Sequence, residues 1–139
     1  MNNELHKVIS ELKRLSGDKR NSLPLPDDEL IKQYEKEIGF NFTPDYKEAI
    51  KKVGNIFYGT IDLLSLTKER NYYGELAQAL ADAREQGLPE TWLPISEDNG
   101  SYYCIDPEGI IRYWTTDGYS DDHWPDLASW IKEVWIDGN

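Results

Sequence analysis

Two turn sequences in the C-terminal half constrain the fold more than any other feature of this chain. Asn-Gly at 99–100 separates the strand-like segments 92–96 and 101–106, and both of these residue types tolerate the positive φ of a tight hairpin. Asp-Pro-Glu-Gly at 106–109 precedes a third such segment, 110–116, with proline and glycine where a β-turn favours them. Three consecutive strands joined by short turns predict an antiparallel meander.

Apolar residues at helical spacing surround this meander. They predict helices at about 3–15, 27–38, 44–53, 74–86 and 126–136. Capping signals support these boundaries: Asp27 or Asp28 can cap the second helix, Gly39 can end it, and Thr43 precedes a proline at the first position of the third helix.

Residues 56–64 (IFYGTIDLL) predict one further strand, with a bulge at Gly59, and 65–73 remains unassigned. The loop 117–125 is expected to connect the last strand to the last helix. The predicted class is therefore α+β: an antiparallel sheet (a meander) with helices packed on one side.

Length and composition favour a globular protein. A chain of 139 residues suits one domain, 1–139, with a sufficient core. Apolar runs are shorter than a membrane span needs, and the polar N-terminal segment lacks the apolar region of a secretion signal. Cys104 is the only cysteine, which excludes an intramolecular disulfide. A cytoplasmic location is the simplest expectation.

Negative charge is concentrated in the C-terminal part of the chain. The net charge is −11, and residues 85–139 hold twelve carboxylates and two cations. This excess argues against direct nucleic-acid binding, which requires a basic face. It favours a basic partner, although acidic proteins also gain solubility from such charge.

Metal binding and catalysis receive little support from the sequence. Neither Asp98 nor Asp117 is followed by the residues of a calcium loop, and Cys104, His6 and His123 are too scattered for a zinc site. An acidic environment disfavours a reactive thiolate at Cys104. The chain also lacks nucleotide-binding and nucleophile motifs. We therefore expect that the protein is not an enzyme and binds neither a metal nor a cofactor.

The remaining interpretation is a protein-binding surface. Interface anchors are often aromatic and lie within a polar rim. The candidate residues lie in the turns and in the expected loop: Asp98, Asn99, Asp117, Tyr119, Asp121, Asp122 and Trp124. Tyr58, Tyr72 and Tyr73 are weaker candidates. On strand 110–116, alternation leaves open whether Tyr113 or Trp114 faces solvent.

Three blocks of sequence resemble the SMI1/KNR4 family, or SUKH superfamily, over roughly residues 27–135. The first, 35–55, matches the family's helix pair through Glu35, Ile38, Gly39, Phe42, Pro44 and Tyr46. The second, 92–117, is similar to the family's two hairpins, and the third is the closing helix with Leu127, Trp130 and Ile131. Val53-Gly54-Asn55 departs from the pattern, because members often carry Asn-Gly there.

The resemblance implies a bacterial immunity protein of a toxin–immunity system, which binds a cognate toxin, frequently a nuclease, without a cofactor. A basic nuclease cleft would complement an acidic aromatic surface. Such a protein would act as a monomer or weak dimer, without membrane or nucleic-acid contact. The alternatives are a non-catalytic regulatory or scaffold domain of the same fold, since the family also includes a fungal regulator linked to cell-wall synthesis, and a small enzyme or ligand-binding module.

Overall fold

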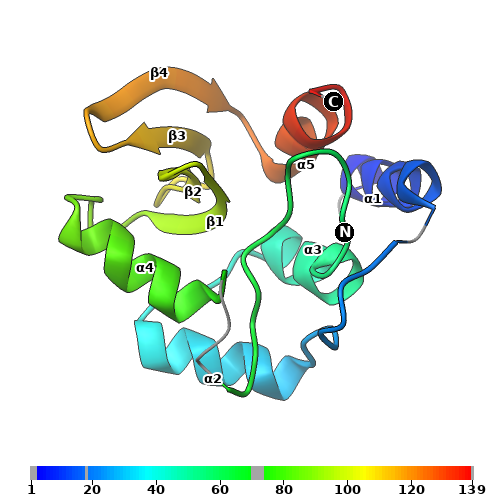
Figure 1. The fold of residues 1–139 in the computed structure, drawn as a ribbon, viewed down its shortest axis with the longest axis horizontal. Helices are drawn as coiled ribbons and strands as arrows, with labels where there is room; N and C mark the ends of the chain where they lie inside the picture. Colours follow the sequence, from blue (N-terminus) through cyan, green and yellow to red (C-terminus); the bar gives the residue numbers. More distant parts are fainter. Residues whose placement is uncertain (1–2, 18, 70–73, 139) are drawn as a thin grey trace.

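The computed structural model describes residues 3–17, 19–69 and 74–138, with the backbone alone at 118–119. Five α-helices and four strands follow in the order shown in Figure 1. The N-terminal helices are α1 (Asn3–Ser16), α2 (Asp28–Ile38), α3 (Pro44–Val53) and α4 (Leu76–Glu85). The strands are β1 (Leu93–Asp98), β2 (Ser101–Ile105), β3 (Ile111–Thr115) and β4 (Gly118–Trp124). The chain then forms α5 (Leu127–Trp130) and a π-helical turn, η1 (Ile131–Ile136).

The predicted helix caps form as expected. Asp27 accepts a hydrogen bond from the backbone N–H of Leu30, and Gly39 ends α2 in the left-handed region at φ 77°. Thr43 accepts from the N–H of Tyr46 at the start of α3. Each contact satisfies a backbone group that a helix end leaves unpaired, so these local signals placed both helix boundaries correctly.

The four strands form one antiparallel sheet in the order β1-β2-β3-β4. The α+β class and the meander are therefore confirmed. Asn99 has φ 50° and Gly100 has φ 90°, as the Asn-Gly hairpin requires. The sheet lies beside the helices (Figure 1): α5 follows directly from β4, and α4 runs next to β1.

The loop predicted at 117–125 was wrong, because residues 118–124 form β4. This segment, GYSDDHW, lacks the apolar alternation of a half-buried strand. An outer strand needs only one hydrogen-bonded neighbour and often carries charges, so its sequence resembles that of a loop. The shift in register between Arg112 and Trp114 marks a bulge in the β3–β4 pair.

The strand predicted at 56–64 was also wrong. In its place the structure has isolated bridges, which join Arg20 to Ile56 and Tyr58 to Ile61. Gly59 has φ 63°, which turns the chain back on itself within the segment. The segment nevertheless reaches the sheet, because the N–H of Leu64 donates to the carbonyl of Ile95 at 2.9 Å.

The core draws buried side chains from all five α-helices and from β1, β2 and β3. Trp130 and Trp135 are among its largest fully buried side chains, and their rings lie 6.0 Å apart between centroids. Burying aromatic rings of this size supplies much of the stabilisation of a small core. Within the described chain, no helix is both long enough and apolar enough to cross a membrane.

Candidate protein-binding surface

The meander places two acidic turns at the same end of the sheet. The 99–100 turn joins β1 to β2, and the turn at 116–117 joins β3 to β4. Alternate turns of a meander lie at the same end, whereas the 106–109 turn lies at the other. Asn99 and Asp117 are exposed there, so the topology brings two predicted residues to one end of the sheet.

Two tyrosines pack together on one face of the sheet. Tyr103 of β2 is directly opposite Tyr113 of β3, and their ring centroids are 4.9 Å apart. Tyr103 also contacts Trp124 at 5.7 Å and Trp130 at 5.3 Å. This face of the sheet therefore runs from the buried Trp130 of α5 outward to the half-buried Tyr113.

Two aspartates accompany these rings. The hydroxyl of Tyr113 donates to Oδ2 of Asp98 at 3.1 Å, and the charges of Asp98 and Asp122 both act on Tyr103 and Tyr113. We use the name tyrosine–aspartate cluster for Asp98, Tyr103, Tyr113, Asp122 and Trp124. It unites three predicted residues, Asp98, Asp122 and Trp124, from two different strands.

The cluster has a negative potential. Burial, followed by the charge of Asp98, raises the pKa of Tyr103 to about 12. At Tyr113 a hydrogen bond with Ser101 lowers the pKa, but burial and the bond to Asp98 outweigh it, so the pKa is raised. Both hydroxyls therefore stay protonated at neutral pH and can donate hydrogen bonds.

The predicted residues differ in how far they are exposed. Asp121 and Asp122 are exposed on β4, and alternation along a strand points neighbouring side chains to opposite faces. Trp124 is half-buried against the core rather than fully exposed. Of Tyr119 only the backbone is described, and Tyr72 and Tyr73 lie outside the described residues. None of Asp98, Asp117, Asp121 and Asp122 forms an ion pair with a described residue.

The sequence prediction did not include Tyr103 and Tyr113 in the candidate surface. The alternation of β3 left open whether Tyr113 or Trp114 is exposed; the structure buries Trp114 and leaves Tyr113 half-buried. β3 keeps this alternation, because it pairs with β2 in regular register; the extra residues of the β3–β4 bulge lie on β4. The sequence did contain a signal for this pair. The length of the turn at 106–109 fixes the register of the hairpin, and that register places Tyr103 opposite Tyr113.

The acidic turn at 106–109 has a structural role. Asp106 is buried and accepts hydrogen bonds from the N–H groups of Glu108 and Ile110. It also pairs with Arg112, whose Nε lies 2.7 Å from Oδ2, while the guanidinium lies over the ring of Trp92. This carboxylate therefore stabilises a turn and is not available to a partner.

Metal binding and nucleophilic chemistry gain no support from the arrangement. Among the described residues, no group of three or more His, Cys, Asp or Glu could hold a metal ion. Cys104 is fully buried, and burial raises the pKa of its thiol well above the usual value. A protonated, enclosed thiol behaves as a small apolar side chain.

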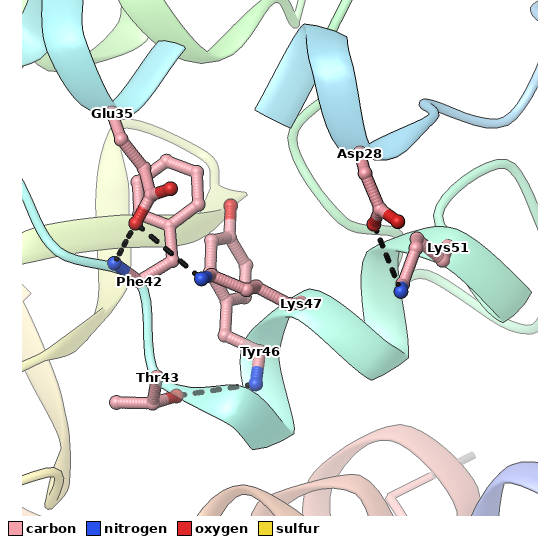
Figure 2. A network of polar contacts seen from close by, with 7 residues as sticks. All are labelled: Asp28, Glu35, Phe42, Thr43, Tyr46, Lys47 and Lys51. Atoms are coloured by element: carbon pink, nitrogen blue, oxygen red, sulfur yellow. Dashed lines mark hydrogen bonds and ion pairs between the residues drawn. The ribbon is translucent and has the colours of Figure 1, made fainter. Parts of the chain in front are cut away.

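The residues that carry the sequence resemblance around 35–46 are also structural. Figure 2 shows that Glu35 of α2 reaches across the α2–α3 turn. Its Oε2 accepts from the N–H of Phe42 at 2.8 Å and lies 3.7 Å from Nζ of Lys47. Phe42 packs edge-on against Tyr46 at 5.0 Å. This motif therefore fixes the angle between two helices and is a signature of the fold.

Comparisons with known proteins agree with this architecture. The sequence model of the SUKH_5 family, described as SMI1-KNR4 cell-wall, matches residues 5–136. A crystal structure of a protein from Pseudomonas syringae pv. tomato is similar, with a TM-score of 0.84 and 24% sequence identity. That alignment covers 95% of this chain and 98% of the other. No curated protein matches the sequence significantly.

The fold thus defines an α+β protein with a four-stranded meander and a helical core. This chain belongs to the SMI1/KNR4 (SUKH) family, because the family match extends over nearly the whole sequence. The likeness to the Pseudomonas protein is a likeness of fold.

Proposed function

We propose that this chain is a cytoplasmic bacterial immunity protein that binds and neutralises a cognate toxin through its acidic aromatic surface. Membership of the SMI1/KNR4 family supports a role of this general kind. The toxin is expected to be basic and to act as a nuclease. No catalysis and no cofactor are required of a protein that only covers a functional surface.

The observation that carries the proposal is the tyrosine–aspartate cluster with the acidic turns beside it. Exposed carboxylates that lack ion pairs within the described chain leave a negative potential that can accelerate encounter with a basic protein. Half-buried rings offer contact area at a low cost in side-chain entropy. The carboxylates would mainly govern association, and the rings would mainly govern dissociation.

Substitution of Asp121 and Asp122 tests whether the carboxylates govern the association rate. We expect Asp121→Asn/Asp122→Asn to slow association with the product of a neighbouring toxin gene by roughly three- to tenfold at low salt, because long-range attraction is reduced. The difference should shrink as salt rises and screens these charges. Stopped-flow measurements at several ionic strengths provide the rates.

A matched control removes the same charge elsewhere. Glu29 on α2 and Glu133 on η1 are exposed, and Glu29→Gln/Glu133→Gln should leave association nearly unchanged. Equal slowing in both variants would show that only net charge matters, and no slowing in either would remove Asp121 and Asp122 from the surface. Failure of the chain to co-purify with the neighbouring gene's product would count against the immunity role itself.

A regulatory or scaffold interaction domain is the second candidate. The description of the matching family model refers to the cell wall, which favours a role outside toxin neutralisation for some members. The same acidic surface would then bind a different protein. The absence of a toxin gene beside this chain's gene would support this alternative.

A further inference from the structure

The two outer edges of the sheet differ in what covers them. At β1 the N–H of Leu64 donates to the carbonyl of Ile95 at 2.9 Å, and the hydroxyl of Ser96 donates to the carbonyl of Asp62 at 2.8 Å. The segment 62–64 therefore closes this edge. At the opposite edge, β4 pairs with β3 on one side, and Figure 1 shows no element of the described chain on its other side. The sheet thus has one closed edge and one open edge.

β4 carries only part of the protection that is usual at an open edge. Natural proteins shorten such strands, bulge them, or place charges, lysine above all, and proline on them. β4 has a bulge and two aspartates, Asp121 and Asp122, but its seven residues make it the longest of the described strands. Residues 118–124 include neither lysine nor proline. Negative charge repels an acidic strand and attracts a basic one, so it selects a partner instead of blocking the edge.

The middle of β4 holds backbone groups that β3 does not pair. The pairing register between the two strands omits 120–122, which form the bulge. The N–H of Asp122 donates to the hydroxyl of Ser120 at 2.9 Å, and Nδ1 of His123 lies 2.9 Å from the carbonyl oxygen of Asp121. Both contacts are exposed and join residues two positions apart. Local side-chain bonds of this kind compete with the bonds of a sheet, so the backbone of a partner strand can replace them.

Trp124 connects the open edge to the tyrosine–aspartate cluster. The centroid of its ring lies 5.7 Å from that of Tyr103, and the charge of Asp122 acts on both Tyr103 and Tyr113. Side chains two positions apart on a strand share a face, so Asp122 and Trp124 both point toward the cluster. A strand added beside β4 would therefore meet a carboxylate and a half-buried ring on the same face of the sheet.

We propose that the open edge of β4 binds an extended, basic segment of a partner protein, which joins the sheet as a fifth strand. In strand addition the main-chain hydrogen bonds supply affinity, and alternate side chains supply specificity. Lysine or arginine opposite Asp121 and Asp122 forms favourable cross-strand pairs. Where the partner is the toxin, this inference deepens the proposed function and rests on it; strand addition itself requires only a basic, extended segment.

A short peptide tests strand addition without the toxin. Acetyl-Thr-Lys-Val-Lys-Val-Lys-Thr-amide, which has the seven-residue length of β4, is titrated into the ¹⁵N-labelled full chain. We expect saturable shifts of the backbone amides in 118–124 and slower hydrogen exchange of these amides in the complex. The same peptide with its three central amides replaced by esters keeps the charge and the shape but lacks those hydrogen-bond donors, and it should bind roughly tenfold more weakly.

Variants of the chain locate the bound peptide. Asp121→Asn/Asp122→Asn removes two charges from the edge and keeps its backbone, so it should weaken binding of the lysine peptide roughly fivefold. The control Glu29→Gln/Glu133→Gln removes two exposed charges from α2 and η1. It should weaken binding less than about twofold, because water and salt screen charges outside the contact.

The outcomes separate this inference from the proposed function. No saturation up to about 1 mM peptide, which corresponds to very weak binding, overturns strand addition. Equal binding of the ester peptide, equal weakening by both double variants, or a dimer of the chain joined through β4 also overturns it. Binding that meets the expectations upholds strand addition even if no toxin binds the chain. Toxin binding without slower exchange in 118–124 overturns strand addition as the mode of toxin recognition and leaves the immunity role intact.

Discussion

Buried and half-buried carboxylates near the helices differ in their partners from exposed carboxylates on the sheet. Glu35 and Glu75 each accept backbone hydrogen bonds and fix the start of a helix or a helix–helix turn. Asp117, Asp121 and Asp122 are exposed and pair with no cation in the described part of the chain. The comparison shows that the high count of acidic residues combines two populations: one stabilises the fold, and the other sets the surface potential.

The largest expected effect is at Glu75. Glu75→Ala removes the N-cap of α4, which is worth about 1 kcal/mol. It also removes the hydrogen bond from the buried hydroxyl of Tyr34 to a charged group, worth about 1.5–3 kcal/mol, although that hydroxyl still reaches the carbonyl of Thr67. We expect the free energy of unfolding to fall by about 3 kcal/mol in urea denaturation. Glu75→Gln, which keeps both acceptor and shape, should lose less. A loss below about 1 kcal/mol in the alanine variant would contradict the structural role.

Asp106 tests whether position or burial decides the behaviour of a carboxylate. It lies within the acidic C-terminal stretch, yet it is buried and paired with Arg112. Asp106→Ala should lower the free energy of unfolding by about 2 kcal/mol, because two backbone N–H groups of the turn lose their acceptor. Thermal denaturation measures this loss. If Asp106→Ala leaves the stability unchanged, Asp106 belongs with the exposed carboxylates that only set the surface potential.

Glu35 should give a smaller effect. Its side chain accepts from Phe42 and approaches Lys47 (Figure 2), so Glu35→Ala should cost about 1.5 kcal/mol of stability. Glu29→Ala on the exposed face of the same helix is the matched control and should change stability by less than about 0.5 kcal/mol. Equal costs for the two variants, measured in urea, would remove the distinction between them.

The smallest effect concerns the proton of Tyr103. Its pKa is raised to about 12, whereas a tyrosine in the unfolded chain titrates near 10. The unfolded chain therefore loses this proton first, and the stability contributed by Tyr103 falls as pH rises between these values. Asp98→Asn removes one negative neighbour and should move the pKa of Tyr103 downward. Absorbance of tyrosinate against pH measures this shift, and an unchanged or higher pKa would contradict the proximity of Asp98.

Sequence reasoning succeeded where the physics is local. Caps at Asp27 and Thr43, the stop at Gly39 and the Asn-Gly hairpin each depend on one or two neighbouring residues. It failed where distant contacts decide the outcome. β4 exists because β3 lies next to it, and 56–64 is bent because it contacts both residue 20 and β1.

The candidate surface was predicted in part for the same reason. Exposed turn residues such as Asn99 and Asp117 could be identified from turn chemistry alone. The pairing of Tyr103 with Tyr113 depends on strand register, and the burial of Glu75 at the start of α4 depends on how α2 and α4 approach each other. No local pattern announces a carboxylate buried by tertiary packing.

The charged outer strand also affects how copies of this chain meet. β4 lies at the margin of the sheet and carries Asp121 and Asp122 in adjacent positions. Antiparallel joining of two such margins would bring four carboxylates into one continuous ladder, and like charges at that spacing repel. Strand-by-strand growth into fibres is therefore opposed from this margin, and high salt, which screens the repulsion, would weaken the protection.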